Sequence, residues 1–452
     1  MIGTEGKVLL DTLRRLHRKR AVDNCIKLIR KTHPADLAWI FRSLTPIEQK
    51  DIFQIIAQTD DIADFLSELD DAIMVELVED FSPRFMARVV SNMASDDAVD
   101  LLEALPDDIS VEIQTHMEAE DRQEVEELLK YHPETAGGLM SPDFMYLDED
   151  LTVDEAINKV QKRSEDKEMV FYIYITHGDG QLTGVLSLRE LILQPMHRQL
   201  RNIMNTNVIS VTTDTDQEEV AHVVSQYNLL AVPVVDATFN LVGIITVDDV
   251  IDVIRNEATE DFLQMAGAGK DQEILLKSTL QNVFIRAPWL AASWLGGVAA
   301  MFIISSFENE LMKTLVLASF IPIVIGMGGN IATQSSTIIV RGIATGRINM
   351  EEFFQLIFKE LQVGLILGAG YGLLLGMLAW MGYSEPVRLG LVVGFSVFFV
   401  MSMATTVGTL VPLVLKRFNI DAAVATGPFV TTSIDILGVY MFFMVARLLL
   451  EF

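Results

Sequence analysis

Cysteine is almost absent from this 452-residue chain, and no histidine pattern typical of a zinc site replaces it. The single cysteine, Cys25, excludes an internal disulfide and a cysteine-ligated metal site. The seven histidines are scattered, and none lies in the long apolar stretches. An intramembrane metalloprotease would need a His-Glu-x-x-His motif on a membrane span, and this motif is missing. We therefore expect a protein that is not an enzyme.

Positive charge is also scarce, and its distribution is uneven. Residues 1–286 contain 53 Asp and Glu against 26 Lys and Arg, whereas residues 287–452 contain 9 against 8. A field this negative argues against nucleic acid as a partner and favours cations. The acidity belongs to the N-terminal part and the apolarity to the C-terminal part, so the two parts are expected to be separate domains.

The C-terminal part has long runs without charge. A membrane-spanning helix needs about 20 predominantly apolar residues, and five stretches qualify: Ala287–Phe307, Thr314–Val340, Leu361–Ser384, Leu389–Leu415 and Ala422–Ala446. Without a secretory signal, the N-terminal part is expected to stay in the cytoplasm. Most Lys and Arg residues then flank the spans on that side, as the positive-inside rule requires, although Arg447 is an exception. We predict a multi-pass protein of the cell (inner) membrane with its C-terminus outside.

Residues 1–134 contain a repeat of short amphipathic helices. Ile62, Phe65, Leu66 and Leu69 follow helical spacing, and the same template recurs 12 residues later, three times in succession. Short helices joined by tight turns predict a stacked superhelix. Residues 51–127 hold 23 Asp and Glu against three Arg and no Lys. This acidity indicates either a solvated surface or a surface that responds to cations.

A second repeat spans 135–199 and 200–255. "MSPDFMYLDEDLTVDEA" corresponds to "MNTNVISVTTDTDQEEV", and "GQLTGVLSLREL" corresponds to "FNLVGIITVDDV". Each copy predicts strand, helix, strand, strand and helix, and the pair resembles tandem CBS domains. Such pairs often bind an adenine nucleotide such as ATP, and Thr246 with Asp249 has the spacing of the ribose contact. The alternative is that Thr246 only caps the next helix, with Asp249 completing a capping box.

The fifth apolar stretch contains one carboxylate, Asp435. A charge at membrane depth costs at least about 2.5 kcal/mol, so it usually faces a bundle interior or an aqueous path. The second span adds Asn330, Thr333, Gln334, Ser335, Ser336 and Thr337, and the fourth adds Ser402, Thr405, Thr406 and Thr409. Oxygen-rich linings suit a hard cation. A homodimer would bring two copies of Asp435 beside a shared axis, where a hydrated Mg²⁺ could bind.

At this point a resemblance becomes specific. "GGNIATQSSTIIVRG" and "ATGPFVTTSIDILG" are similar to the most characteristic motifs of the MgtE family of magnesium channels and transporters, and the likeness covers essentially the whole chain. It implies a multidomain fold: an all-α superhelical N domain at 1–134, α+β tandem CBS domains at 135–199 and 200–255, a connecting plug helix at 256–285, and a bundle of five transmembrane helices at 286–452.

The resemblance also implies roles for individual residues. In the pore it implies that Asp435 binds hydrated Mg²⁺, with Asp421 at the cytoplasmic mouth and Asn330, Thr333 and Thr337 near the ion path; many members have Asn in place of Thr333. The family closes its pore when cytosolic Mg²⁺ bridges carboxylates of the soluble domains and plug. The matching carboxylates are Asp96, Asp100, Asp216, Glu218, Asp249, Asp252, Glu257, Glu260 and Asp261.

Two other functions remain open from the residues alone. One is a broader transporter of divalent cations with the same fold that also accepts Co²⁺ or Mn²⁺. A non-conducting Mg²⁺ sensor is a further alternative, although an intact Asp435 and a polar second span argue against it. The leading interpretation is a magnesium-selective channel or transporter for uptake, acting as a homodimer and closed by cytosolic Mg²⁺.

Overall fold

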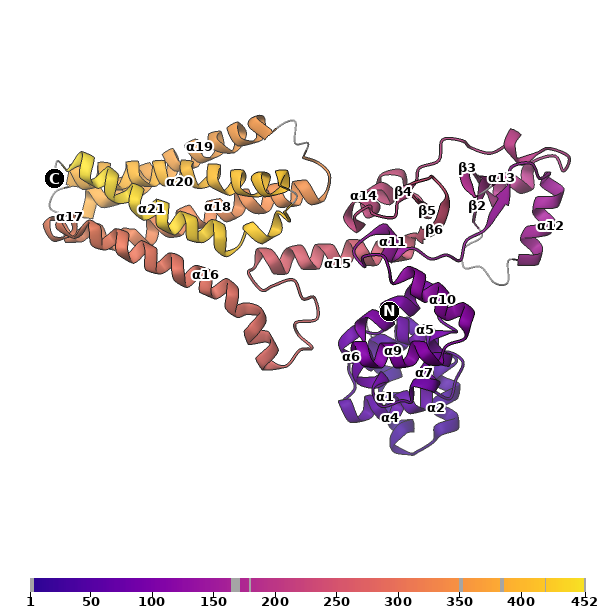
Figure 1. Cartoon of the computed structure of the whole chain (residues 1–452). Helices are drawn as coiled ribbons and strands as arrows, with labels where there is room; N and C mark the ends of the chain where they lie inside the picture. Colours follow the sequence, from indigo (N-terminus) through magenta and orange to yellow (C-terminus); the bar gives the residue numbers. More distant parts are fainter. Residues whose placement is uncertain are drawn as a thin grey trace. The chain divides into compact units, whose positions relative to one another are not determined.

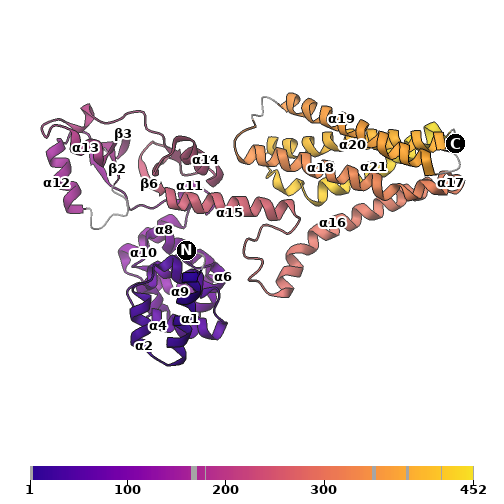
Figure 2. The ribbon, with the colours of Figure 1, turned by 180° about the vertical axis from the view of Figure 1, so that it is seen from behind.

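The computed structural model describes residues 4–163, 171–178, 180–348, 353–382, 386–418 and 420–450. The chain separates into two compact units, Met1–Val253 and Ile254–Phe452. Figures 1 and 2 show the ribbon from opposite sides. We describe each unit by itself.

The first unit begins with a series of short helices. These are α1 (Thr4–Arg18), α2 (Val22–Ile29), α3 (Pro34–Phe41), α4 (Pro46–Ile56), α5 (Ile62–Ser67), α6 (Asp71–Val78), α7 (Pro83–Val90), α8 (Ser95–Ala104), α9 (Asp107–His116), α10 (Ala119–Leu128) and α11 (Ala136–Leu139). Proline occupies the first helical position of α3, α4 and α7, where its missing N–H is not needed. Thr45 and Glu48 add a capping box at the start of α4. These signals explain why the helices are short and begin at regular intervals.

Helices two apart in sequence pack on each other. α3 contacts α5 and α5 contacts α7, while α4 contacts α6 and α6 contacts α8. The apolar residues of the repeat lie between them: Phe65 and Leu66 are fully buried, and Leu77, Val89 and Leu101, which are equivalent to Phe65, are buried as well. The predicted superhelix is therefore confirmed, because each short helix buries its apolar face only against its neighbours in the stack.

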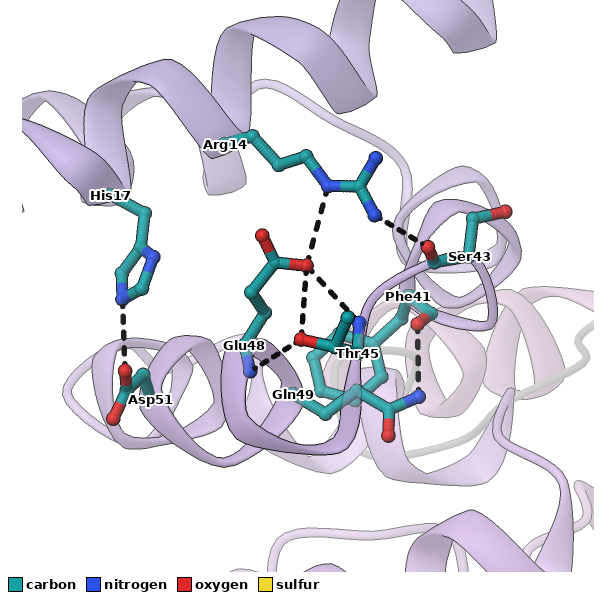
Figure 3. A network of polar contacts seen from close by, with 8 residues as sticks. All are labelled: Arg14, His17, Phe41, Ser43, Thr45, Glu48, Gln49 and Asp51. Carbon is teal, nitrogen blue, oxygen red and sulfur yellow. Dashed lines mark hydrogen bonds and ion pairs between the residues drawn. The ribbon is translucent and has the colours of Figure 1, made fainter.

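Polar contacts fasten the first helix to this stack. Arg14 of α1 donates to the Ser43 carbonyl at 2.8 Å and pairs with Glu48 Oε2 at 3.3 Å, while His17 Nε2 lies 3.1 Å from Asp51 Oδ2 (Figure 3). Leu13 on the same helix is 1% exposed. The basic start of the chain is thus a helix on the surface of the N domain, with its apolar face in the core.

Two small sheets follow, each with a parallel pair and an antiparallel pair. The first consists of β1 (Tyr146–Asp148), β2 (Tyr172–His177) and β3 (Gln181–Ser187), and the second of β4 (Val211–Thr212), β5 (Ala231–Val235) and β6 (Leu241–Thr246). Their helices are α12 (Val153–Arg163), α13 (Leu188–Leu193) and α14 (Gln217–Tyr227), with a 3₁₀ turn, η1 (Leu200–Asn202). Both antiparallel pairs have an irregularity at the equivalent point, Ile175/Thr176 and Val234/Val235. The repeat predicted for the CBS pair is therefore present in the topology.

A methionine near the start of each copy packs against a strand of the other copy. A Cβ atom at Gly184 in β3 would lie 2.5 Å from the sulfur of Met204, which begins the second copy. A Cβ atom at Gly243 in β6 would lie 2.7 Å from the sulfur of Met140, which begins the first. Backbone bridges between Ser141 and Ile244 and between Val185 and Asn205 follow the same reciprocal pattern. Each strand glycine makes room for the methionine of the other copy, so the pair folds as one body.

A single helix, α15 (Val247–Met265), joins the CBS pair to the second unit. It begins directly after β6 and passes without interruption through the position where the sequence suggested a change from CBS domain to connector. The next helix starts at Thr279, capped by Ser278 and Gln281. At about 1.5 Å per residue, α15 is about 28 Å long.

The second unit contains five helices that are long and apolar enough to cross a membrane, counted over the described residues. They are formed by α16 (Thr279–Ser306), α18 (Ile321–Ala344) with the preceding 3₁₀ turn η2 (Leu315–Ser319), α19 (Phe353–Gly382), α20 (Pro386–Arg417) and α21 (Pro428–Leu449). The short α17 (Glu308–Lys313) and η4 (Ala423–Ala425) lie in the connections. Each of the five predicted spans coincides with one of these helices, although α21 starts at Pro428 instead of Ala422 and the end of the third prediction, residues 383–384, lies outside the described residues.

Glycine allows α19 and α20 to approach closely over the stretch from Gly364 to Gly376 of α19. A Cβ atom at Gly372 would lie 2.5 Å from the Gly394 carbonyl oxygen, and one at Gly376 would lie 2.8 Å from the Gly390 oxygen. Small residues at such spacing let helix backbones touch where no hydrophobic effect drives them together. The two helices therefore form a backbone-to-backbone contact.

Arg447, the exception to the positive-inside pattern, forms an ion pair. Arg447 Nε of α21 lies 3.7 Å from Glu310 Oε1 of α17, and Glu310 is buried. The pair neutralises both charges at the end of the bundle where α21 finishes. Arg447 therefore does not add a free positive charge there.

Candidate functional site

Asp435 lies on α21, about two turns after the helix begins at Pro428. Its side chain is half-buried, and no hydrogen bond or ion pair connects it to another described residue. α21 packs against α16, α18 and α20. The carboxylate therefore lies on a spanning helix, and no cationic side chain among the described residues pairs with it.

Three helices meet tightly one residue before Asp435. A Cβ atom at Gly328 of α18 would lie 2.8 Å from Val400 Cγ1 of α20 and 2.9 Å from Ile434 Cγ2 of α21. Ile434 and Val400 are fully buried. Because Gly328 has no side chain, the helices can approach this closely, and the contact sets the position of α21 along the axis of α18.

The polar residues of α18 divide into two groups. Asn330, Gln334 and Thr337 share one face by their spacing, and this face is exposed in the single chain. Thr333 is half-buried, and its hydroxyl donates to the Gly329 carbonyl at 3.0 Å. Ser335 and Ser336 are buried, with the Ser335 hydroxyl donating to Glu360 Oε2 of α19 at 2.8 Å. The exposed face is the part of α18 available to an ion path.

Of the four α20 hydroxyls that the sequence suggested, three do not line such a path, because Ser402, Thr405 and Thr409 are buried in the packed bundle. Thr405 and Thr409 are 0% exposed, and they donate to the carbonyls of Ser402 and Thr405 in their own helix. Thr406 and Ser402 likewise donate to backbone carbonyls of α20. A Cβ atom at Gly364 would lie 2.2 Å from Thr405 Oγ1, so this hydroxyl faces α19. Intrahelical bonding satisfies these groups inside the packed bundle.

The start of α21 meets the end of α15. A Cβ atom at Gly427 would lie 3.0 Å from the Met265 carbonyl oxygen and 3.3 Å from that of Gln264. Met265 also packs on a small apolar cluster with Val340 of α18 and Ala422. Asp421 lies beside this cluster, exposed, and accepts a hydrogen bond from the Ala423 amide at 2.8 Å. The connector helix thus contacts both helices that carry the candidate pore residues.

A second set of carboxylates gathers within the first unit. Asp96, Asp97 and Asp100 lie on α8, and Asp249 lies in the first turn of α15. Asp97 and Asp249 repel each other electrostatically, as do Asp96 and Asp249. One oxygen of Asp96, Oδ1, is buried without a hydrogen-bond partner. The fold therefore brings acidic residues of the N domain against acidic residues of the second CBS domain.

This crowding raises the pKa of each carboxyl. Burial, followed by repulsion from Asp97, raises the pKa of Asp96 to about 6. Burial and then repulsion from Asp249 raise the pKa of Asp97 to about 6. Burial raises the pKa of Asp249 to about 7, against the hydrogen bond from Thr246. The pKa of Asp100 rises to about 7 through desolvation and then repulsion from Asp97, although its side chain keeps solvent access. The charges that perturb these four groups are all negative, so a cation would stabilise the ionised cluster.

Asp97 was missed by the sequence analysis, which selected Asp96 and Asp100. The two selected residues are one helical turn apart, a spacing that places them on one face. Asp97 lies on that surface too, and it joins the acidic cluster because α15 lies opposite. No local sequence pattern in α8 reveals this contact. Asp64, Glu68 and Asp248 also act on Asp97 and were missed for the same reason.

Other predicted regulatory residues lie elsewhere. Asp216 caps α14 by accepting a hydrogen bond from the Glu218 amide at 2.9 Å, and it pairs with Thr135 in an isolated bridge. On α15, Asp252 is exposed, while Glu257 and Asp261 are half-buried. Glu260 pairs with Lys270 Nζ at 2.7 Å and accepts a hydrogen bond from Gln264 at 2.7 Å. Lys270 therefore already compensates Glu260, unlike the carboxylates of α8.

Thr246 and Asp249 adopt the capping geometry. Asp249 Oδ2 accepts hydrogen bonds from the Thr246 hydroxyl at 2.5 Å and from the Thr246 amide at 3.3 Å. Ser187 and Glu190 form the equivalent capping box at the start of α13. Thr246 is buried, so the cap occupies its hydroxyl in this structure. Among the described residues, no group of three or more His, Cys, Asp or Glu side chains forms a site able to hold a metal ion.

Three family descriptions match successive parts of the chain. Residues 32–134 match the MgtE intracellular N domain, residues 136–196 and 200–256 match CBS domains, and residues 321–445 match the MgtE divalent cation transporter. These matches follow the order of the domains described above.

Relatives cover nearly the full length. The magnesium transporter MgtE of Bacillus subtilis is 34% identical over 93% of this chain and 92% of its own, and that of Thermus thermophilus is 34% identical over 94% and 95%. A solved structure, the cytosolic domain of the Mg²⁺ channel MgtE in complex with ATP, is 32% identical, with a TM-score of 0.52, over 54% of this chain and 99% of that one.

Proposed function

The chain belongs to the MgtE family of multi-pass membrane proteins, and from this premise we propose that it carries Mg²⁺ across the membrane through a path shared by two copies. The observation that supports this most is Asp435, a half-buried carboxylate on a spanning helix with no partner among the described residues. One chain supplies a single charge there, and a homodimer would supply two. A bundle with two carboxylates and many neutral oxygens suits a divalent ion that keeps several of its waters.

The ion path we propose follows the exposed face of α18. Asn330 and Thr337 would contact waters of the hydrated ion, and Thr333, whose proton is committed to Gly329, would offer its lone pairs as an acceptor. Asp421 would attract cations at the mouth. We place the N domain and CBS pair in the cytoplasm and the C-terminus outside, because Lys and Arg then flank the spans mainly on the cytoplasmic side.

Gating in this proposal uses the acidic surfaces. At high cytosolic Mg²⁺, ions bind between α8 and the start of α15, and further ions bind near Asp216, Glu218, Asp252, Glu257, Glu260 and Asp261. Bound cations screen the repulsion and hold these surfaces together. α15 then closes the path through its contact with α21 at Gly427. Without Mg²⁺ the carboxylates repel and the equilibrium shifts toward the open state.

Flux through the reconstituted chain tests the transport proposal. Liposomes containing the full chain and a Mg²⁺ indicator should show uptake that increases with an inside-negative potential, because the field favours entry of a divalent cation. Co²⁺ and Mn²⁺ in the outer solution should reduce the signal only slightly if the path selects Mg²⁺; strong competition would favour a broader divalent transporter. A chain that acts only as a sensor would give the same signal as empty liposomes.

We also propose ATP binding at the CBS pair, with Thr246 and Asp249 contacting the ribose. Binding would require the Thr246 cap to be shared with the nucleotide, since both use the same side chains. Thr246→Ala with Asp249→Ala should reduce the ATP affinity measured by calorimetry at least about tenfold, as expected for the loss of two hydrogen bonds. The matched control is Ser187→Ala with Glu190→Ala, which removes the equivalent cap of α13. Equal loss in both variants would assign the effect to folding and contradict the site.

A further inference from the structure

A pocket of about 550 Å³ opens between the end of α18 and the first turns of α19. One wall is apolar, with Ile338, Ile339 and Leu356. The rest includes the basic side chains of Arg341, Arg347 and Lys359. None of the functions above requires these three cations.

The turn after α18 brings two of the cations together. Gly346 adopts φ +63°, and the amides of Arg347 and Ile348 both donate to the Gly342 carbonyl, at 2.9 and 3.1 Å. The chain therefore reverses onto the last turn of α18 and returns Arg347 to the side where Arg341 lies. This is a local backbone motif that its own hydrogen bonds stabilise.

The positive charge in the pocket is only partly compensated. Arg341, Arg347 and Lys359 are exposed, and they form no ion pair with any residue that the structure describes. The one carboxylate in the lining, Glu360, accepts the hydrogen bond from Ser335. Glu351 and Glu352, which follow in the sequence, lie outside the described residues. Among its described lining residues, the pocket carries three cations and one anion.

The position of the pocket relates it to the membrane surface. The charge-free run of α18 ends at Val340, one residue before Arg341. Val340 packs against Met265 of α15, so the pocket lies at the end of the bundle where the connector helix arrives. An apolar wall beside a basic rim at the end of a span matches the chemistry of a lipid with an acidic headgroup.

We propose that this pocket binds an anionic phospholipid, with its phosphate on Arg341, Arg347 and Lys359 and the upper part of an acyl chain along Ile338, Ile339 and Leu356. Arginine offers planar paired donors for phosphate oxygens, and lysine adds a point charge. The site does not depend on ion transport, because it uses only the spans and their charges. A soluble phosphate would share the polar contacts but would leave the apolar wall without a partner.

Lipid association with the full chain tests the proposal. The wild type and the variant Arg341→Gln/Arg347→Gln/Lys359→Gln are placed in nanodiscs of phosphatidylcholine containing trace spin-labelled phosphatidylglycerol. The wild type should retain a motionally restricted phosphatidylglycerol population that the triple variant loses. Each cation near the surface contributes roughly a fivefold change in association, so the loss should exceed tenfold. The single variant Lys359→Gln should show an intermediate value even if the triple variant folds poorly.

A control variant distinguishes lipid binding in the pocket from general attraction of the lipid to basic side chains on the protein surface. Lys416→Gln/Arg417→Gln removes two cations from the last turn of α20 and leaves the pocket intact. This control variant should keep the motionally restricted phosphatidylglycerol. Inorganic phosphate at about tenfold excess over the labelled lipid should not displace the lipid, although a ligand of similar affinity would compete at that excess. Equal retention by wild type and triple variant, equal loss in the control pair, or displacement by phosphate would each overturn the proposal.

Discussion

Replacing Asp435 with asparagine should abolish Mg²⁺ uptake while leaving the protein folded. Asparagine keeps the shape and an acceptor oxygen but removes the charge. Coulomb's law gives about 7 kcal/mol for one carboxylate and a divalent cation about 5 Å apart at an effective dielectric constant of about 20. Even a third of this attraction corresponds to a factor of roughly 40 in ion occupancy. We therefore expect uptake into liposomes to fall at least about 40-fold, and the thermal unfolding temperature to stay level or rise, because a charge at membrane depth is costly.

Ser433→Ala provides the matched control for this measurement. Ser433 lies two residues away on the same helix and is half-buried like Asp435, but it carries no charge. Its uptake should stay within about twofold of the wild type. Asp435→Glu should recover part of the flux, since the charge returns in a different position. Wild-type uptake by Asp435→Asn would refute the pore assignment.

Neutralising the carboxylates between α8 and α15 should remove the response to cytosolic Mg²⁺. The variant Asp96→Asn/Asp97→Asn/Asp249→Asn keeps acceptors for the cap at Thr246 but abolishes the cluster that attracts cations. A ligand shifts an equilibrium only by its differential affinity for the two states. Patch recordings should therefore show currents that change less than about twofold between Mg²⁺-free solution and about 10 mM internal Mg²⁺, whereas the wild type closes.

The control for this experiment changes the same net charge on a neighbouring helix. Asp107→Asn/Asp108→Asn/Glu112→Gln alters three exposed acidic residues of α9 and leaves the α8 cluster unchanged. These channels should close with Mg²⁺ as the wild type does. Wild-type closure in the α8 variant would show that the ions act at other carboxylates, such as those along α15. Loss of closure in both variants would show that total charge matters and position does not.

Local sequence patterns predicted the elements of the fold well and their boundaries less well. The predicted spans were defined by missing charge, which marks the apolar membrane core. Helical hydrogen bonding continues beyond it, so α16 starts at Thr279 instead of Ala287 and α19 starts at Phe353 instead of Leu361. The helical repeat of the N domain was recognised because its apolar spacing is local and strict. The 12-residue period then placed Phe65 and its equivalents in the core.

Features that depend on contacts between distant segments were beyond sequence reasoning. Nothing near Gly184 indicates that Met204 will fill the space above it, and nothing in α8 indicates that Asp249 will lie opposite Asp97. The hydroxyls of α20 illustrate the opposite error. Their composition suggested a polar lining, but a threonine in a helix can satisfy its own hydroxyl on the preceding turn, so composition alone does not reveal which way it faces.

The backbone contact between α19 and α20 determines which helices are able to move. Where Gly372 meets Gly394 and Gly376 meets Gly390, sliding by even one residue would drive side chains into a neighbouring main chain. The hairpin of α19 and α20 is therefore a rigid part of the bundle, and other helices rearrange relative to it. Gly408 of α20 approaches the Ala332 backbone of α18 in the same way, so α18 belongs to this fixed part. Conformational change in the bundle is left to α16 and α21, and α21 carries the carboxylate of the proposed ion path.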